Sequence, residues 1–247
     1  MTAAPALDLI EPDWAAPPGV RALVTTRRGG ASHGRFASFN LAAHVGDDPA
    51  AVACNRARLR SLLPAEPVWL EQVHGATAVA ADAAPPGTRA DAAVTRVRGT
   101  VCAVLSADCL PVLLADRRGR AVGIAHAGWR GLAAGVIEAA VARIGVPPAA
   151  LVAWLGPAIG PGVYEVGAEV RAALVAADAG AAAAFAERPG GKFLADLYAL
   201  GRRRLAAAGV TEVAGGGFCT FTERDRFFSY RREGTTGRFA SLIWMDR

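Results

Sequence analysis

Two kinds of apolar pattern alternate along the chain. Some runs, such as TVCAVLSADC over 100–109, have almost no polar alternation, which is typical of strands buried on both faces. The segment 131–145 instead repeats apolar residues along one stripe and ends in glycine, as expected of a helix packed on a sheet. Together the patterns predict strands over 21–26, 67–73, 100–109, 111–116, 120–126, 151–156, 226–230 and 238–245, and helices over 49–63, 131–145, 166–177 and 194–208.

The order of these elements predicts a mixed α/β fold. A chain of 247 residues is long enough to bury most of its apolar surface in one large domain. No repeat or low-complexity linker divides it. The turn-rich stretch 81–91 is expected to be a connector, and the alanine-rich stretch 178–190 a loose helix and loop on the surface. We therefore expect one domain over residues 1–247.

Composition excludes several classes of protein. The hydrophobic fraction of 53% and the charged fraction of 20% are those of a globular protein rather than a disordered one. No apolar run approaches the ~20 residues of a membrane span, and the N-terminus lacks the pattern of a signal peptide. We expect a cytoplasmic protein without membrane contact. Its four cysteines, none of them in a CxxC pair, are expected to be reduced.

The net charge of +5 is carried almost entirely by scattered arginines, since Lys192 is the only lysine. The close groups are limited to 202–204 and the pair Arg231 and Arg232. Nucleic-acid binding usually needs a basic stripe or patch. The charge therefore favours a small anionic substrate or phosphate as partner, and no nucleic acid.

Three residues with metal-binding side chains follow or end predicted strands. His74 comes after 67–73, Cys109 ends 100–109, and His126 ends 120–126. Two imidazoles and a thiolate suit zinc, whose fourth position would stay open for water or substrate, and copper would also accept them. The alternative is that the cysteine is a small apolar core residue and the histidines are ordinary polar residues. The other two histidines, His33 and His44, lie in polar, turn-like segments.

The segments around these residues resemble a known family. EQVHG (71–75), ADCLPVLLAD (107–116) and HAGWRG (126–131) are similar to the YfiH family, whose members have been called laccase-domain proteins, multicopper polyphenol oxidases and peptidoglycan editing factors. Further segments that fit, in the family's order, are 28–59, 154–167, 218–221 and 227–238.

The resemblance implies a single α/β domain of layered mixed sheets flanked by helices. It also implies that His74, Cys109 and His126 are the metal ligands. The activity it implies is phosphorolysis of adenosine, inosine, guanosine and methylthioadenosine, together with deamination of adenosine. One position departs from the pattern: Gly162 stands where the family often has a cysteine after IGP.

The remaining candidates follow from what these reactions need. A deamination needs a proton shuttle, which Asp108 could supply, although a strand-end aspartate equally often accepts bonds from nearby backbone N–H groups. Phosphorolysis needs donors and positive charge for phosphate, for which Arg130 and the pair Arg231 and Arg232 are candidates; ordinary ion pairs are the alternative. Asn40 and Gln72 are candidates for bonding a base or ribose, and Trp129 is expected to pack.

Three functions compete at this point. The first is a zinc-dependent purine nucleoside enzyme. The second is a muropeptide hydrolase that uses Cys109 as nucleophile without a metal. The third, a copper oxidase of the laccase type, conflicts with the count of four histidines, because a multicopper site needs many imidazoles. We expect a monomer, although no motif decides the oligomeric state.

Overall fold

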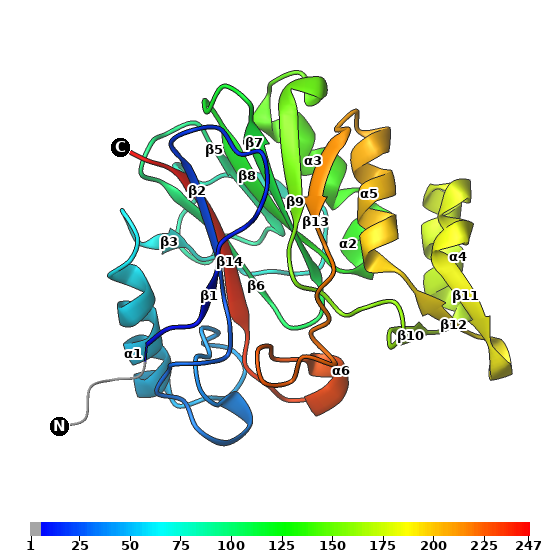
Figure 1. Cartoon of the computed structure of the whole chain (residues 1–247), viewed down its shortest axis with the longest axis horizontal. Coiled ribbons are helices and arrows are strands. Elements are labelled where there is room, and N and C mark those ends of the chain that lie inside the picture. Colours follow the sequence, from blue (N-terminus) through cyan, green and yellow to red (C-terminus); the bar gives the residue numbers. More distant parts are fainter. Residues whose placement is uncertain (1–5) are drawn as a thin grey trace.

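Two large β-sheets lie face to face at the centre of the protein (Figure 1). The computed structural model describes residues 6–247. One sheet has the strand order β1 (Leu9–Ile10), β2 (Val20–Thr25), β14 (Phe239–Met245), β6 (Val101–Ser106) and β3 (Pro67–Val68). The other has the order β13 (Glu212–Gly215), β9 (Leu151–Leu155), β7 (Leu110–Asp116), β8 (Val122–Ala127), β5 (Ala92–Thr95) and β4 (Ala78–Ala80).

Helices cover the outer faces of both sheets. The five-stranded sheet packs against α1 (Pro49–Arg60), and the six-stranded sheet against α2 (Trp129–Ala134), α3 (Val136–Ile144) and α5 (Leu197–Ala207). A small unit projects at the right of Figure 1. It consists of α4 (Ala168–Ala177) and a sheet of β10 (Glu165–Val166), β12 (Lys192–Ala195) and β11 (Phe185–Arg188). The short helices are α6 (Tyr230–Glu233) and the 3-10 turns η1 (Gly34–Phe36), η2 (Pro148–Ala150), η3 (Ala179–Ala184) and η4 (Pro189–Gly191).

The four layers explain why the central strands are apolar on both faces. In β6, Cys102 and Val104 point into the core between the two sheets, whereas Ala103 and Leu105 point into the core under α1. Side chains alternate between the faces of a strand, so a strand with a core on each side has no solvent-facing position. The prediction of a mixed α/β domain of layered sheets flanked by helices is confirmed.

Several predicted elements differ from the structure. The stretch 178–190, expected to be a loose helix and loop, forms the 3-10 turn η3 and the strand β11. The strand expected over 226–230 is wrong: Phe227 and Phe228 are fully buried in irregular backbone, and α6 follows them. They are apolar because they fill the core, not because they pair in a sheet. The helix expected over 131–145 begins at Trp129 and is divided at Gly135, which has a φ of 89°. The strand expected over 67–73 is formed only at Pro67–Val68, and Glu71 adds one isolated bridge to Arg89.

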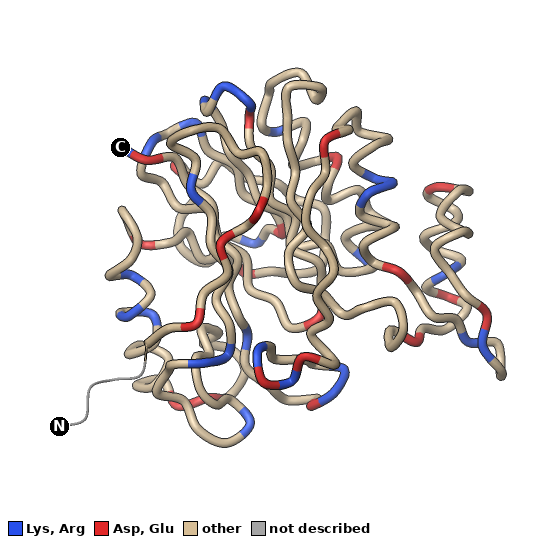
Figure 2. The backbone as a smooth tube through the Cα atoms, viewed as in Figure 1, with Lys and Arg blue, Asp and Glu red and all other residues tan. Residues whose placement is uncertain are grey.

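Charged residues are spread over many elements, with acidic and basic groups interspersed (Figure 2). Within residues 6–247, no helix is both long and apolar enough to cross a membrane. All four cysteines are free thiols.

Candidate metal centre and its cavity

Three metal-binding side chains from separate segments meet at one end of the central strands. His74 lies in the loop between β3 and β4, Cys109 directly precedes β7, and His126 lies near the end of the neighbouring strand β8. Their ligand atoms are all within 4.8 Å of one another. The two imidazole rings meet edge to face, with centroids 4.8 Å apart. Because β7 and β8 are antiparallel, the start of one and the end of the other bring Cys109 and His126 together.

A buried carboxylate that the sequence analysis did not single out supports two of these ligands. Asp91 is fully buried and lies 2.9 Å from Nδ1 of His126. It also accepts backbone hydrogen bonds from Val73, His74 and Gly75 at 3.1, 2.9 and 2.7 Å. Burial raises the pKa of this carboxyl, but the bonds from His126 and the loop outweigh burial and lower it. Asp91 is therefore an anion when the site is assembled.

The ligands also set each other's ionisation. Burial raises the pKa of the Cys109 thiol, but the charge of His126 and hydrogen bonds from both histidines outweigh it and lower the pKa to about 6. Burial lowers the pKa of His126, but Cys109 and the bond to Asp91 outweigh it and raise the pKa to about 9. At neutral pH the metal-free pair is a thiolate and an imidazolium. A cation would therefore meet a sulfur that is already ionised, which is the form that binds zinc.

Two glycines keep room for this cluster. A Cβ at position 128 would lie 2.8 Å from Sγ of Cys109 and 3.2 Å from Cδ2 of His74. A Cβ at Gly131 would lie 3.1 Å from the backbone oxygen of Gly75, in the loop that carries His74. The small residues of HAGWRG thus allow the start of α2 to approach both ligands, and the space between the ligands is kept free of protein atoms. The donor set and this space fit a single metal ion.

The cluster opens into a cavity of about 420 Å³. The cavity carries many cationic and aromatic groups and one carboxylate, and it is lined by His44, Gln72, His74, Leu105, Ser106, Ala107, Asp108, Cys109, His126, Trp129, Arg130, Tyr164, Tyr230, Arg231 and Arg238.

The guanidinium groups of three arginines in this cavity form no ion pair with a carboxylate within residues 6–247. Arg130 lies over the ring of Trp129, 4.5 Å from its centroid. Arg231 donates to the backbone oxygen of Glu165 at 2.5 Å. Arg238 donates to two backbone oxygens of its own turn, and burial lowers its pKa although Cys109 and Asp108 oppose this effect. Arg130 and Arg231 are exposed and Arg238 is partly buried. Their guanidinium charges are not neutralised by a carboxylate, so the cavity favours an anionic ligand.

Asp108 is the carboxylate of the cavity, and both of its oxygens are occupied. It accepts from the hydroxyl of Thr220 at 2.6 Å and from the backbone N–H of Arg231 at 2.7 Å. Its φ of 102° is unusual for a residue other than glycine. Asp108 thus fixes the turn before Cys109 to α6. This arrangement is close to the alternative of a strand-end aspartate that bonds backbone N–H groups.

Two predicted substrate-binding residues use their amides within the protein. Asn40 does not line the cavity: it is fully buried, donates to Ala42 and Asp47, and accepts from the backbone N–H of Arg238. Gln72 lines the cavity, but its amide exchanges two hydrogen bonds with the backbone of Leu105. Asn40 therefore positions Arg238, and Gln72 holds the loop before His74 against β6.

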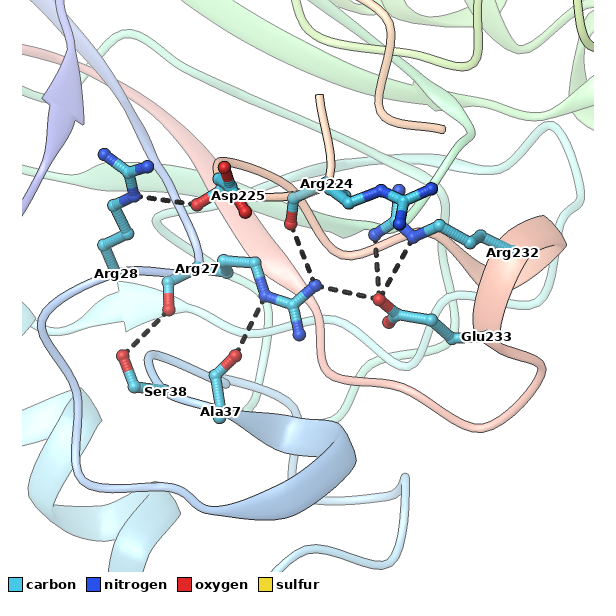
Figure 3. A pocket seen from close by; sticks show the side chains of 8 residues that line it. All are labelled: Arg27, Arg28, Ala37, Ser38, Arg224, Asp225, Arg232 and Glu233. Carbon is cyan, nitrogen blue, oxygen red and sulfur yellow. Dashed lines mark hydrogen bonds and ion pairs between the residues drawn. The ribbon is translucent and has the colours of Figure 1, made fainter. Parts of the chain in front are cut away.

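Arg232 does not line the cavity of the metal cluster. It lines a second, more open cavity of about 580 Å³, where it bonds Glu233 beside Arg27 (Figure 3). Its remaining N–H groups donate to backbone oxygens of Thr220, Phe221 and Phe227. Its contacts anchor α6, so the ion-pair alternative describes Arg232, whereas its neighbour Arg231 lines the cavity of the candidate metal cluster.

Several residues that line the cavity were not predicted. His44, Tyr164, Tyr230 and Arg238 line it, although His44 had been set aside as part of a turn. They fall in segments that resemble the family (28–59, 154–167 and 227–238), but no local pattern marks them individually, since they lie in loops or in the short helix α6. Asp91 has a weak signal: it is a charged residue at the start of a buried apolar strand.

The chain is similar to one family model, to curated proteins that share one name, and to solved structures of the same fold. Residues 21–246 match the family described as multi-copper polyphenol oxidoreductase laccase. The chain is 57% identical to purine nucleoside phosphorylase PA4543 of Pseudomonas aeruginosa over 96% of this chain and 98% of that protein. It is 53% identical to purine nucleoside phosphorylase YfiH of Escherichia coli, again over 96% and 98% of the two chains. The crystal structure of Neisseria meningitidis protein NMB0706 superposes with a TM-score of 0.94 at 50% identity, over 97% of this chain and 99% of that one.

Proposed function

Because this chain belongs to the multi-copper polyphenol oxidoreductase laccase family, which the sequence analysis identified as the YfiH family, we propose that it is a metal-dependent purine nucleoside phosphorylase. Two of its relatives carry that activity in their names. One observation carries the proposal: the His74, Cys109 and His126 cluster opens into the same cavity as three arginines without carboxylate partners.

The arginines distinguish phosphorolysis from reactions with water. In phosphorolysis an oxygen of phosphate forms a bond to C1′ of the ribose, the bond from C1′ to N9 breaks, and the purine leaves with the electron pair and takes up a proton. The nucleophile is a phosphate anion, a mixture of monoanion and dianion at neutral pH, so it needs positive charge and several donors. Arg130, Arg231 and Arg238 would bind and orient it. Deamination of adenosine joins a neutral nucleoside and water, so it does not require these positive charges.

The aromatic side chains would hold the nucleoside. Burial, together with the charge of Cys109, raises the pKa of Tyr164 to about 12, so its hydroxyl stays protonated and can donate to the substrate. Trp129 and Tyr230 add apolar surface beside it. Purine nucleosides have both an apolar face and polar edges, which suits a cavity of this composition.

His74, Cys109 and His126 would hold the metal, for which zinc is the proposed ion and copper the alternative. A zinc ion there would supply Lewis-acid polarisation of a bound oxygen or leaving group. Within residues 6–247 this is the one cluster of three or more such ligands, so a multicopper centre of the laccase type is not proposed despite the family's name.

Adenosine deamination is a second activity of the same site. Asp108 lies beside Cys109 and lines the cavity, so it is the carboxylate that would carry the proton. Its two oxygens are already accepting hydrogen bonds, and for this reason phosphorolysis is the preferred reaction.

The muropeptide alternative would use Cys109 as nucleophile with a histidine as base. The free thiols fit a reducing compartment such as the cytoplasm.

Product analysis tests the proposal. The purified zinc-loaded protein is incubated with adenosine or inosine, with and without inorganic phosphate. We expect free purine and ribose 1-phosphate only when phosphate is present. Inosine from adenosine in the absence of phosphate would show that deamination dominates. Activity that survives complete removal of the metal by a chelator would refute the metal-dependent reaction, and the absence of any product would refute the proposal.

A further inference from the structure

One carboxylate contacts both histidine arms of the metal cluster. The Oδ1 atom of Asp91 lies 2.9 Å from both Nδ1 of His126 and the backbone nitrogen of His74. Its Oδ2 atom accepts from the backbone N–H groups of Val73 and Gly75 at 3.1 and 2.7 Å. The side chain is fully buried. These five residues span segments that are up to 53 positions apart, as the numbers 73 and 126 show.

The contact with the loop determines where His74 lies. Three consecutive N–H groups that point at one anion form a backbone nest, which requires an unusual turn of the chain. His74 has a φ of 59°, a left-handed conformation that is uncommon for residues other than glycine. The Asp91 carboxylate fills this nest. Without that anion the three backbone N–H groups would have no acceptor at the position of the carboxylate. The left-handed conformation of His74 would then lose the hydrogen bonds that stabilise it.

The contact with the ring determines which nitrogen of His126 faces the metal. A carboxylate accepts but does not donate, so Nδ1 of His126 carries the proton that it donates to Asp91. The backbone N–H of His126 also donates to the backbone oxygen of Asp91, at 2.7 Å. These two bonds fix the ring, and Nε2 is left as the nitrogen available to a metal.

We propose that Asp91 is the positioning residue of the metal centre: its carboxylate orders the loop that carries His74 and holds His126 in the tautomer that binds metal through Nε2. The inference rests on the proposed metal site but not on the proposed reaction. Asp91 acts through the ligands and does not itself bind the ion.

The substitution Asp91→Asn tests this with little change of volume. An amide has one acceptor atom, so its NH₂ group must face either the N–H groups of Val73 and Gly75 or the donors of His74 and His126. Loss of such a partner in other metal sites weakens metal binding by about 10- to 100-fold, and we expect a zinc dissociation constant raised by that factor. Zinc affinity is measured by competition with a chromophoric chelator, and Co²⁺ absorption spectra report the geometry of the ligands.

Asp116→Asn is the matched control. Asp116 is also fully buried, and it accepts from Arg120 at 2.6 Å at the far end of β7. Six strand steps separate that end from the Cys109 end, which is about 20 Å. This variant also loses a buried carboxylate, but its zinc affinity and Co²⁺ spectrum are expected to match those of the unmodified protein.

Each outcome is decisive. Weaker zinc binding and an altered Co²⁺ spectrum in Asp91→Asn alone support the inference, whereas equal affinities in the two variants overturn it. If the unmodified protein binds no zinc, the metal site itself is refuted. If Asp91→Asn does not fold, nitrogen NMR of the unmodified zinc-loaded protein decides. A protonated Nδ1 and a metal-bound Nε2 on His126 support the inference, and the opposite assignment overturns it.

Discussion

The substitution Gly128→Ala would separate metal binding from folding. Gly128 has φ −72° and ψ 169°, an extended conformation that alanine adopts without strain. A Cβ at this position would lie 2.8 Å from Sγ of Cys109, whereas ordinary contact begins at 3.4 Å. The added methyl group and the sulfur must therefore separate by about 0.6 Å. Metal–ligand distances tolerate about 0.2 Å, so the sulfur cannot move this far and keep its place in the ligand set.

We expect the zinc affinity of Gly128→Ala to fall by at least about tenfold, which corresponds to about 1.4 kcal/mol. The metal-free protein should be nearly as stable as before. Replacing glycine in an allowed conformation typically stabilises a protein by about 0.4–1 kcal/mol through the unfolded chain, and this gain offsets part of the strain at Cys109.

Two measurements test this expectation: zinc titration against a competing chelator, and thermal unfolding of the metal-free protein. Gly162→Ala is the control, because a Cβ at Gly162 would have no atom within 4 Å. Zinc affinity in Gly128→Ala equal to that of the control would refute the reasoning. A large loss of stability without metal would show that the clash disturbs the fold rather than the ligand set.

Three further predictions follow from the same contacts. Arg231→Ala should raise the KM for phosphate about tenfold, with a smaller effect on the KM for the nucleoside, because a charge-assisted bond contributes about 1.5–3 kcal/mol; steady-state kinetics at varied phosphate check this, and an unchanged phosphate KM would contradict it. In the metal-free protein, alkylation of Cys109 by iodoacetamide should have its midpoint near its pKa of about 6, whereas buried Cys102, with a raised pKa, should not react at neutral pH; a Cys109 midpoint near the ordinary thiol value of about 8.5 would be inconsistent with the ion pair. Glu233→Gln should lower the free energy of unfolding by about 2 kcal/mol at neutral pH, because it breaks a largely buried ion pair with Arg27. Burial raises the pKa of Glu233, but its partners outweigh burial and lower it, so this stabilisation is present above the unfolded pKa and is lost as the pH falls through the folded value. Urea unfolding at neutral and acid pH should show the difference, and an equal effect at both would argue against it.

Many of the secondary-structure elements could be predicted because their patterns have local causes. The stripe of Leu132, Val136, Ala140 and Ile144 is buried as expected, since helical periodicity is a property of one segment. The same logic failed at 226–230. An apolar pair such as Phe227 and Phe228 indicates burial, but burial alone does not distinguish a strand from irregular chain that fills a core.

The three candidate ligands could be singled out from sequence because each lies within a recognisable motif, and Cys109 and His126 also adjoin or end apolar strands. The residues that contact or surround these ligands could not be found from sequence. Asp91 is 35 positions from His126, and Arg231 is 123 positions from Asp108. No local pattern links residues so far apart, because their contact depends on how the sheets and loops pack.

The sequence by itself determined the residue types at the candidate metal centre and the layered α/β character, because ligand chemistry and burial on both faces of a strand are properties of short segments. Only the tertiary structure decided which polar residues serve the site. It placed Arg231 in the cavity and its neighbour Arg232 in an ion pair behind α6, and it brought Asp91 under two ligands. The physical reason is that the partners of a charged group are selected by the packing of distant elements, whereas the charge itself is a property of the residue.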